Sequence, residues 1–413
     1  MQKTLFVKYR LLTVMLLLLA MLLSACGGEE PAETTVATPQ STTVATTLVS
    51  TSVTTGATTT TEPLASGTLA PNSGVVVTTA NTTTPPETTS ETTVASEPAV
   101  DPVLVNFLTG LPVDDVAVNS MRPVAVVYNN LRIALPQHGI AAADIVFEVE
   151  AEGGITRLVA IYSDVSATGT IGSVRSARPV MVNIAMGLDC VFVHSGGSPQ
   201  AYTDLKKYGV TDIDGLYDGG VVFYRDSGRA ASMGYEHSLM TTGTRLSTQL
   251  QKFENSGKRM TLKDGYTAPF AFYDFNTTPV GATSAAKVTT KYGSYQPFFR
   301  YDATSGNYLR YQYGARHVDN NGGEQLSFKN VVVLSVTSSV ISGDSAGRRQ
   351  FNDVGSGSGI YATNGVSIPI RWSKASATAP LVLTTEDGSV LRLNPGKTFI
   401  SYVNGMGNIV VGD

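Results

Sequence analysis

The sequence predicts an α+β fold: an N-terminal α/β-type domain with a mixed sheet, followed by a mostly β C-terminal domain. Between residues 103 and 262, strand-like apolar runs alternate with helix-like runs, a pattern typical of helices packed on a sheet. From about residue 263 to 413, strand-like runs follow one another and are separated by the turn signals "TSGN", "NNGG" and "EDGS". A low-complexity region precedes both predicted domains, so the chain divides into parts of different composition.

Residues 1–26 predict an export signal. Lys3, Lys8 and Arg10 precede the apolar run Leu11–Leu23, which is shorter than the ~20 residues that a bilayer-spanning helix needs. The run ends in "LSAC", the pattern of a lipobox, in which Cys26 becomes lipidated. We therefore expect an extracytoplasmic protein that is anchored to the cell membrane through the lipid on Cys26.

Residues 27–102 predict a disordered stalk rich in Thr, Ser and Pro. No lysine or arginine occurs between Arg10 and Arg122, and large apolar side chains are too few to offset the entropy cost of ordering. A coil of about 75 residues has a mean end-to-end distance of roughly 50 Å. Such a stalk is either a passive tether or a carrier of O-linked sugars.

The net charge of the whole chain, −4, indicates no nucleic-acid partner.

The predicted N-terminal domain contains four strands and three helices. A good helix signal is Ser198 at the N-cap, Pro199 at the first helical position and Gly209 after the end. The strands are expected at 122–130, 143–154, 157–163 and 190–197, and the helices at 179–188, 198–209 and 241–255. In the C-terminal domain, Asp387-Gly388 predicts a hairpin turn, and the glycine-rich residues 355–361 predict a turn or bulge.

A row of carboxylates is predicted along the strand 143–154. A period of two places Asp144, Glu148, Glu150 and Glu152 on one face. Carboxylates in such a row repel one another unless cations lie opposite. One interpretation is therefore a structural network in which arginines from the segments 157–178 neutralise the row through bidentate contacts.

The same arginines support a second interpretation, an anion-binding cleft. Ser176 is a candidate N-cap for a helix that has Pro179 in its first turn, and cations at a helix N-terminus favour an incoming anion. The segment "HSGGSPQ" offers glycines for close backbone approach and a second helix start. The candidate ligand-binding residues are Arg157, Arg175, Ser176, Arg178, His194, Gly196, Gly197, Ser198, Arg225 and His237.

Many segments after the stalk resemble the YerB-like lipoproteins, a bacterial family built around a domain of unknown function. The matching segments include "NFLTGLPV", "RPVAVVYNN", "ADIVFEVEAEGGITRLVAIY", "IGSVRSARP", "VHSGGSPQAY", "NVVVLSV" and "LNPGKTFI". The resemblance implies a two-part extracytoplasmic lipoprotein and implies no reaction. One departure concerns the family's Pro-His-Asn, where this chain has Glu236-His237-Ser238 and therefore lacks the asparagine amide.

Three classes of function remain open from the sequence. The first is a protein that binds an anionic cell-wall component, for example one bearing phosphate or carboxylate. The second is an envelope hydrolase that uses His194 or His237, although "HSGGS" lacks the nucleophile-elbow spacing. The third is a scaffold that binds an envelope protein. We expect no cofactor and no metal, because the four histidines are scattered and paired cysteines are absent from the sequence.

Overall fold

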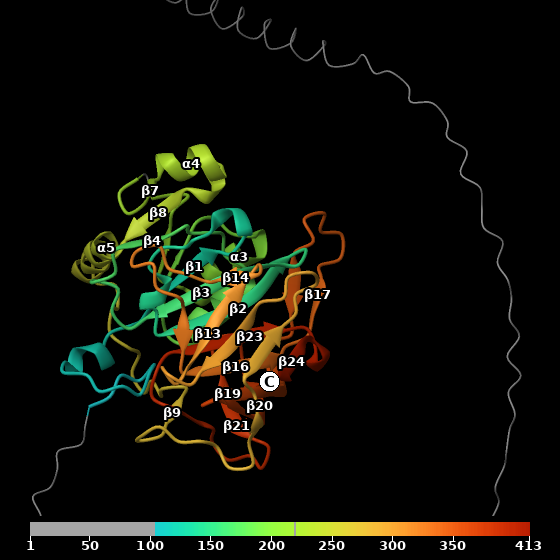
Figure 1. Cartoon of the computed structure of the whole chain (residues 1–413). Helices are drawn as coiled ribbons and strands as arrows, with labels where there is room; N and C mark the ends of the chain where they lie inside the picture. The colour runs from blue at the N-terminus through green and yellow to red at the C-terminus, as the bar shows by residue number, and fades with distance from the viewer. Residues whose placement is uncertain (1–103, 219) are drawn as a thin grey trace, which may run out of the picture. The chain divides into compact units, whose positions relative to one another are not determined.

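A computed structural model describes residues 104–413, except Gly219 (Figure 1). The predicted signal peptide at 1–26, with Cys26, and the predicted stalk at 27–102 lie outside the described residues. Among the residues that are described, no helix is both long enough and apolar enough to cross a membrane.

The largest sheet of the described chain has eleven strands. Its order is β10-β20-β19-β16-β23-β2-β3-β1-β5-β6, with β21 paired to β20. The pairs β2–β3 and β3–β1 are antiparallel, and β1–β5, β5–β6 and β2–β23 are parallel. The strand bounds are β1 Val124–Asn129, β2 Ile145–Glu152, β3 Ile155–Tyr162, β5 Val191–His194, β6 Asp212–Asp214, β10 Thr283–Ser284, β16 Asn330–Ser335, β19 Gly355–Thr363, β20 Val366–Lys374, β21 Val382–Thr385 and β23 Thr398–Val403.

Of the four α-helices in the described chain, the second has the start and the end that the sequence predicts. Ser198 caps the second of them, since the Ala201 N–H donates to its Oγ at 3.2 Å, and Gly209 ends it in the left-handed conformation. The α-helices are α2 Pro179–Gly187, α3 Pro199–Tyr208, α4 Ser227–Met233 and α5 Gly243–Asn255. The 3₁₀ helices are η1 Val116–Asn119, η2 Arg132–Ala134, η3 Ile140–Ala142, η4 Tyr235–His237 and η5 Met406–Asn408.

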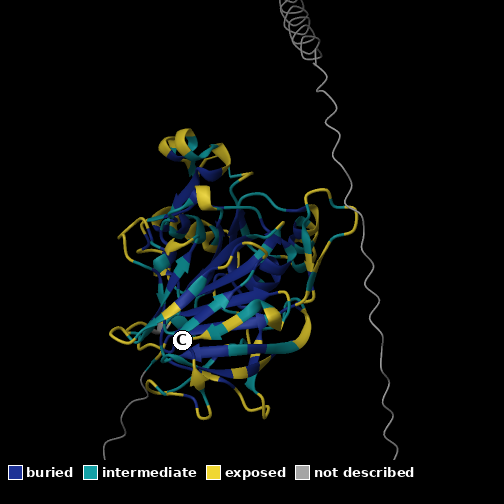
Figure 2. Cartoon of the chain, turned by 45° about the vertical axis from the view of Figure 1, so that its right-hand side comes forward, coloured by how far each residue is buried: buried dark blue, intermediate teal, exposed yellow. Residues whose placement is uncertain are grey.

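Alternation along each strand gives the large sheet a core on both faces. On β1, Ala125 and Val127 belong to the core that includes the buried side chains of α2 and α3. Val126 and Tyr128 belong to the opposite core, which includes Leu246 of α5. Figure 2 shows this arrangement as long buried strands in the middle of the molecule and exposed residues on α4 and the loops. Strands buried on both faces fix their neighbours firmly, so residues at their ends are well positioned.

A second sheet covers part of the large one and comes from the C-terminal region. It has the order β14-β13-β12-β11-β24, with β15 paired to β13. Phe299 and Phe328 of this sheet pack edge-on against Phe399 of β23. The bounds are β11 Lys287–Thr290, β12 Phe298–Asp302, β13 Asn307–Gln312, β14 Ala315–Arg316, β15 Ser327–Phe328 and β24 Ile409–Gly412. The smaller sheets contain β4 Thr170–Gly172, β7 Tyr224–Arg225, β8 Leu239–Thr242, β9 Ala271–Phe272, β17 Ser338–Val340, β18 Arg349–Phe351 and β22 Arg392–Leu393.

Strands from both predicted domains are neighbours in the large sheet. Ile145 of β2 pairs in parallel with Thr398 of β23, and Glu148 pairs with Ser401. The fold is the α+β class that the sequence predicts, with a mixed sheet first and mostly strands afterwards. The domain ranges 103–262 and 263–413 stay a prediction.

Two local predictions are wrong. The glycine-rich segment forms strand β19 instead of a turn, because its glycines allow close packing: a Cβ on Gly357 would lie 2.5 Å from Trp372 Nε1, and one on Gly359 would lie 2.5 Å from the Val333 carbonyl O. Ser176 caps no helix, because residues 175–177 stay extended and α2 begins at Pro179 with Arg178 at its N-cap position. The hairpin predicted at Asp387-Gly388 is present, with Gly388 at φ 86°.

Candidate functional site

The segment that contains Arg175 and Arg178 runs beside the glycine segment that follows β5. The Ala177 N–H donates to the Gly196 carbonyl O at 2.9 Å, and the Ser198 N–H donates to the Ala177 carbonyl O at 3.2 Å. The Ser195 N–H donates to the Arg175 carbonyl O at 3.0 Å. These contacts place the two predicted motifs side by side, where α2 and α3 begin.

Glu152, at the end of β2, accepts hydrogen bonds from two arginines. Arg157 Nη2 lies 2.7 Å from Oε1, and Arg178 Nη2 lies 2.7 Å from Oε2. Burial opposes ionisation of Glu152, but the charges of Arg157 and Arg178 lower the pKa of its carboxyl group. Burial and the charge of Arg178 lower the pKa of the Arg157 guanidinium to about 9. The structure therefore contains the Arg–carboxylate contact expected by the first interpretation, at one carboxylate of the row.

Arg175 lies beside this cluster and is less constrained. Its hydrogen bond in the described chain runs from Nη1 to the Glu236 carbonyl O at 2.9 Å, and its side chain is half-buried. Burial lowers the pKa of Arg175, and the charges of Arg178 and Arg225 lower it further while Glu236 opposes them. Next to it, the backbone N–H groups of Ser176 and Gly197 make no hydrogen bond within the described residues.

Arg225 and His237 come from the small sheet and η4 that face Arg175. Arg225 is exposed, donates from Nη1 to the Tyr235 carbonyl O at 2.7 Å and lies 4.1 Å above the Tyr235 ring. Asn129 Nδ2 lies 2.7 Å from His237 Nδ1. Because the Asn129 Oδ1 accepts from a backbone N–H, its amide N donates to His237, which leaves the histidine proton on Nε2. Burial and the charge of Arg175 lower the pKa of His237.

His194 is a structural residue in this arrangement. Its side chain is fully buried, its Nδ1 lies 2.9 Å from the Gly196 carbonyl O and its Nε2 lies 3.1 Å from Asp212 Oδ2. Ser198 uses its hydroxyl to cap α3. Among the residues described, no serine hydroxyl is within hydrogen-bond distance of His194 or His237, so these groups form no nucleophile–base pair.

Sequence reasoning missed the partners of the other carboxylates in the row. Glu148 is fully buried and lies 2.8 Å from Nη2 of Arg310, which is also fully buried. Glu150 lies 3.1 Å from Arg349 Nε. One signal in the sequence could have indicated that Arg310 is buried. Arg310 alternates with Tyr308 and Gln312 on one face of β13, and that face is buried. For metals, the described residues contain no group of three or more His, Cys, Asp or Glu side chains that could hold an ion.

The fold and site define an α+β protein whose two sequence regions share one sheet, with an arginine cluster at the end of a central strand. The chain belongs to the family described as "Protein of unknown function (DUF3048)": its N-terminal domain matches residues 108–256 and its C-terminal domain matches residues 287–400. The family resemblance predicted from the sequence is confirmed.

Two comparisons connect this family to one relative. The chain is 31% identical over 301 residues to a Bacillus subtilis (strain 168) protein named "Putative lipoprotein YerB". The aligned region covers 72% of this chain and 85% of that protein. The crystal structure of YerB protein from Bacillus subtilis matches with a TM-score of 0.65 and 30% identity, over 75% of this chain and all of that chain.

Proposed function

We propose that this protein is a lipid-anchored extracytoplasmic protein that binds a phosphate- or carboxylate-bearing component of the cell envelope. The anchor rests on the lipobox pattern that ends at Cys26 and on the relative that carries the name lipoprotein. The binding surface consists of Arg175, Ser176, Gly197 and Arg225, beside the Arg157–Glu152–Arg178 cluster. We call it the arginine surface.

The observation that carries the proposal is a surplus of positive charge at one place. Four arginines lie close enough to influence one another there, and the carboxylates that oppose them are Glu152 and Glu236. Glu152 is engaged by two of the arginines, whereas Arg175 contacts a backbone carbonyl. An anion at Arg175 would offset the remaining charge without displacing an existing ion pair.

The backbone around Arg175 supports the same ligand class. Ser176 and Gly197 are half-exposed, and their N–H groups have no partner in the described chain. Backbone N–H donors without a partner suit the oxygens of a phosphate or carboxylate group. The Tyr235 ring, which is 66% exposed and stacks under Arg225, borders this surface and offers an apolar face for the rest of the ligand.

Isothermal titration of the full-length lipidated protein in detergent tests the binding. The titrants are poly(glycerol phosphate) and an uncharged polysaccharide of similar length. We expect saturable binding of the phosphate polymer only, and at least tenfold weaker binding by Arg175→Gln. Arg300→Gln is the matched control, because Arg300 is an exposed arginine on β12. Equal affinities of the wild type and Arg175→Gln, or no phosphate binding at all, would contradict the proposal.

The anchor has a separate test. Cys26→Ala removes the sulfur that would carry the lipid, so we expect the variant to leave the membrane fraction of expressing cells. Wild type and Cys190→Ala, which alters the buried thiol of the folded part, should both stay in that fraction. Retention of Cys26→Ala with the membranes would contradict lipid anchoring through this residue.

A further inference from the structure

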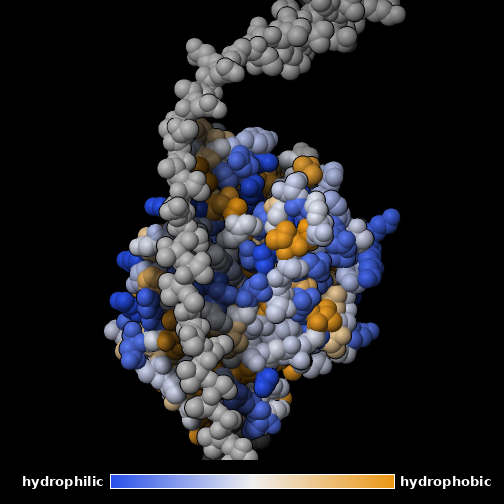
Figure 3. Space-filling model, turned by 90° about the vertical axis from the view of Figure 1, so that its right-hand side faces the viewer, coloured by the Kyte–Doolittle hydropathy of each residue, from blue (hydrophilic) through white to orange (hydrophobic). Residues whose placement is uncertain are grey.

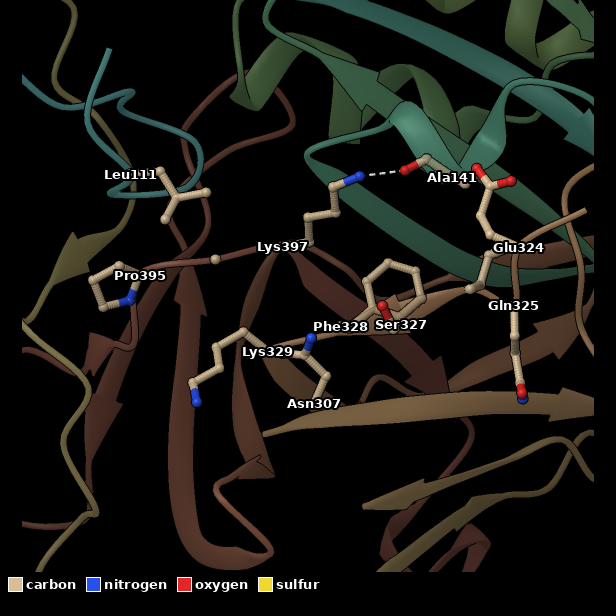
Figure 4. A pocket seen from close by; sticks show the side chains of 12 residues that line it. Leu111, Ala141, Asn307, Glu324, Gln325, Ser327, Phe328, Lys329, Pro395 and Lys397 are labelled. Atoms are coloured by element: carbon tan, nitrogen blue, oxygen red, sulfur yellow. Dashed lines mark hydrogen bonds between the residues drawn. The ribbon is translucent and has the colours of Figure 1, made fainter. Parts of the chain in front are cut away.

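A cavity of about 370 Å³ lies away from the arginine surface, where loops of both sequence regions meet (Figure 4). Leu111 and Ala141 come from the N-terminal region. The rest of the lining comes from Asn307 at the start of β13, from β15 and its flanks, and from the turn before β23. This volume is in the range of small-molecule sites. The lining residues that carry the argument are Glu324, Phe328, Lys329 and Lys397.

Lys397 places an ammonium group in this cavity with hydrogen-bonding capacity left. Its Nζ donates to the Ala141 carbonyl O, its one hydrogen-bond partner among the described residues. An ammonium group has three N–H donors, so two remain for a ligand. The side chain is half-buried, and burial lowers the pKa of Lys397, while Asp144 and Glu324 oppose this effect.

Glu324 supplies the opposite charge at the same end of the cavity. Its carboxylate makes no ion pair within 4.0 Å in the described chain, although its charge reaches Lys397. Figure 4 shows the side chains of Lys397 and Glu324 extending toward Ala141 from different segments. A lysine and a carboxylate that share a cavity without contacting each other present two separate charged ends to a ligand.

The turn that carries Lys397 is held rigidly. Asn330 is fully buried and its Nδ2 donates to the Asn394 carbonyl O at 2.8 Å, while its Oδ1 accepts from the Asn394 N–H at 3.1 Å. Gly396 has φ +140°, and a Cβ there would lie 2.6 Å from Cβ of Lys329. Groups fixed before a ligand arrives lose little conformational entropy on binding, so these contacts favour a binding site over an incidental gap.

Lys329 adds a second ammonium group on the other side of that turn. It donates to the Asn364 Oδ1 at 2.7 Å and to the Gly306 carbonyl O at 3.1 Å, which leaves one of its three N–H donors. Burial lowers the pKa of Lys329 as well. Phe328 is buried and lies between Glu324 and Lys329 in the sequence. It contributes an apolar part to the lining of the cavity.

We propose that this cavity binds a small zwitterion, a free α-amino acid, with its carboxylate at Lys397 and its ammonium group at Glu324. A simple anion would satisfy the lysines and leave Glu324 against a second negative charge. A simple cation would satisfy Glu324 and leave Lys397 beside a second positive charge. The volume admits one amino acid and its side chain, and the apolar lining suits the aliphatic part.

Titration of the full-length lipidated protein in detergent tests the proposal. The panel contains the twenty L-amino acids and D-alanine, followed by the deaminated and decarboxylated analogues of the tightest binder. We expect saturable binding of at least one amino acid, and at least tenfold weaker binding of both analogues, because each lacks one charge. No saturable binding by any amino acid, or an analogue that binds equally well, would overturn the proposal.

Variants locate the site. Glu324→Gln keeps the shape of an exposed side chain and removes its charge, so we expect at least tenfold weaker binding with an unchanged Tm. Glu386→Gln, an exposed glutamate of the β21 hairpin, is the control and should bind as the wild type does. Unchanged affinity in Glu324→Gln would overturn the assignment. Arg175→Gln should bind the amino acid normally, so failure of the arginine surface and failure of this cavity are distinguishable.

Discussion

Glu148 and Glu152 lie four residues apart on β2, and their surroundings differ in burial and in the number of arginine partners. Glu148 is fully buried and has one arginine, Arg310, which is fully buried too. The Glu152 side chain is 20% exposed and shares its two oxygens between Arg157 and Arg178. The first site is closed and pairs one carboxylate with one arginine, whereas the second has two buried arginines around one partly exposed carboxylate.

The carboxylates of one strand are therefore neutralised by arginines from different parts of the chain. At Glu148, the second oxygen accepts from the Thr156 hydroxyl at 2.9 Å and from Asn130 Nδ2 at 3.2 Å, so the buried ion is hydrogen-bonded on both sides. Buried ion pairs stabilise a fold only when their remaining hydrogen-bonding groups are satisfied. Both oxygens of Glu148 meet this condition, whereas Arg310 Nη1 is buried without a hydrogen-bond partner in the described chain. At Glu152, two buried arginines contact a carboxylate that is partly exposed, and the half-buried Arg175 lies beside them without a carboxylate contact.

The largest effect should come from removing the buried partner. Arg310→Met leaves the Glu148 carboxylate buried without its cation, so we expect the free energy of unfolding to fall by about 3–5 kcal/mol. Urea denaturation measures it. The double variant Glu148→Gln/Arg310→Met should be more stable than the single variant, because no uncompensated charge remains. A loss below about 1 kcal/mol for Arg310→Met would remove the distinction between the two sites.

At the partly exposed Glu152, the loss should be smaller. Arg178→Met removes two hydrogen bonds to Glu152, from Nε at 3.0 Å and from Nη2 at 2.7 Å. Glu152 keeps Arg157 and partial contact with water, so we expect a loss of about 2 kcal/mol in the same urea experiment. A loss as large as that of Arg310→Met would mean that Glu152 is as closed as Glu148.

The pH dependence of stability should report on His317, whose Nδ1 accepts a hydrogen bond from Nε of the buried Arg310 at 3.1 Å. Burial and the charge of Arg310 hold the pKa of His317 well below its ordinary value of 6.5. The unfolded chain therefore binds a proton that the folded chain refuses, and stability falls as the pH drops below about 6.5, by up to about 1.4 kcal/mol per pH unit. The free energy of unfolding at pH 7, 6 and 5 should fall less steeply in His317→Gln. Parallel pH profiles would contradict this account.

The smallest change in stability should come from Arg175. Its side chain contacts one backbone carbonyl at the surface, so Arg175→Gln should alter the free energy of unfolding by no more than about 0.5 kcal/mol. Thermal unfolding without ligand measures this change. A loss above about 2 kcal/mol would assign Arg175 a structural role like that of Arg178 and would contradict the binding proposal.

Local signals in the sequence predicted much of the fold but only part of the site. The Ser198-Pro199 start and the Gly209 end of α3 depend on neighbouring residues, and so they are readable from sequence. Glu148 and Arg310 are 162 positions apart, and their contact depends on how the second sheet covers the first. The strand also has an irregular register between Glu150 and Glu152, which a strict period of two does not include.

One face of the described chain is mostly polar. Figure 3 shows one face on which hydrophobic residues form small separate groups among hydrophilic ones. The figure offers no large apolar patch on the visible described part of that face.

Anomalous diffraction from crystals soaked in selenate locates a bound anion directly. Selenate carries the charge and geometry of a phosphate-like group, and its selenium marks the position. We predict a selenium peak beside the Arg175 guanidinium and the N–H groups of Ser176 and Gly197, absent from Arg175→Gln crystals. A peak of equal height in both, or selenate bound elsewhere while this surface stays empty, would contradict the claim that the positive charge left over at the end of β2 serves a ligand.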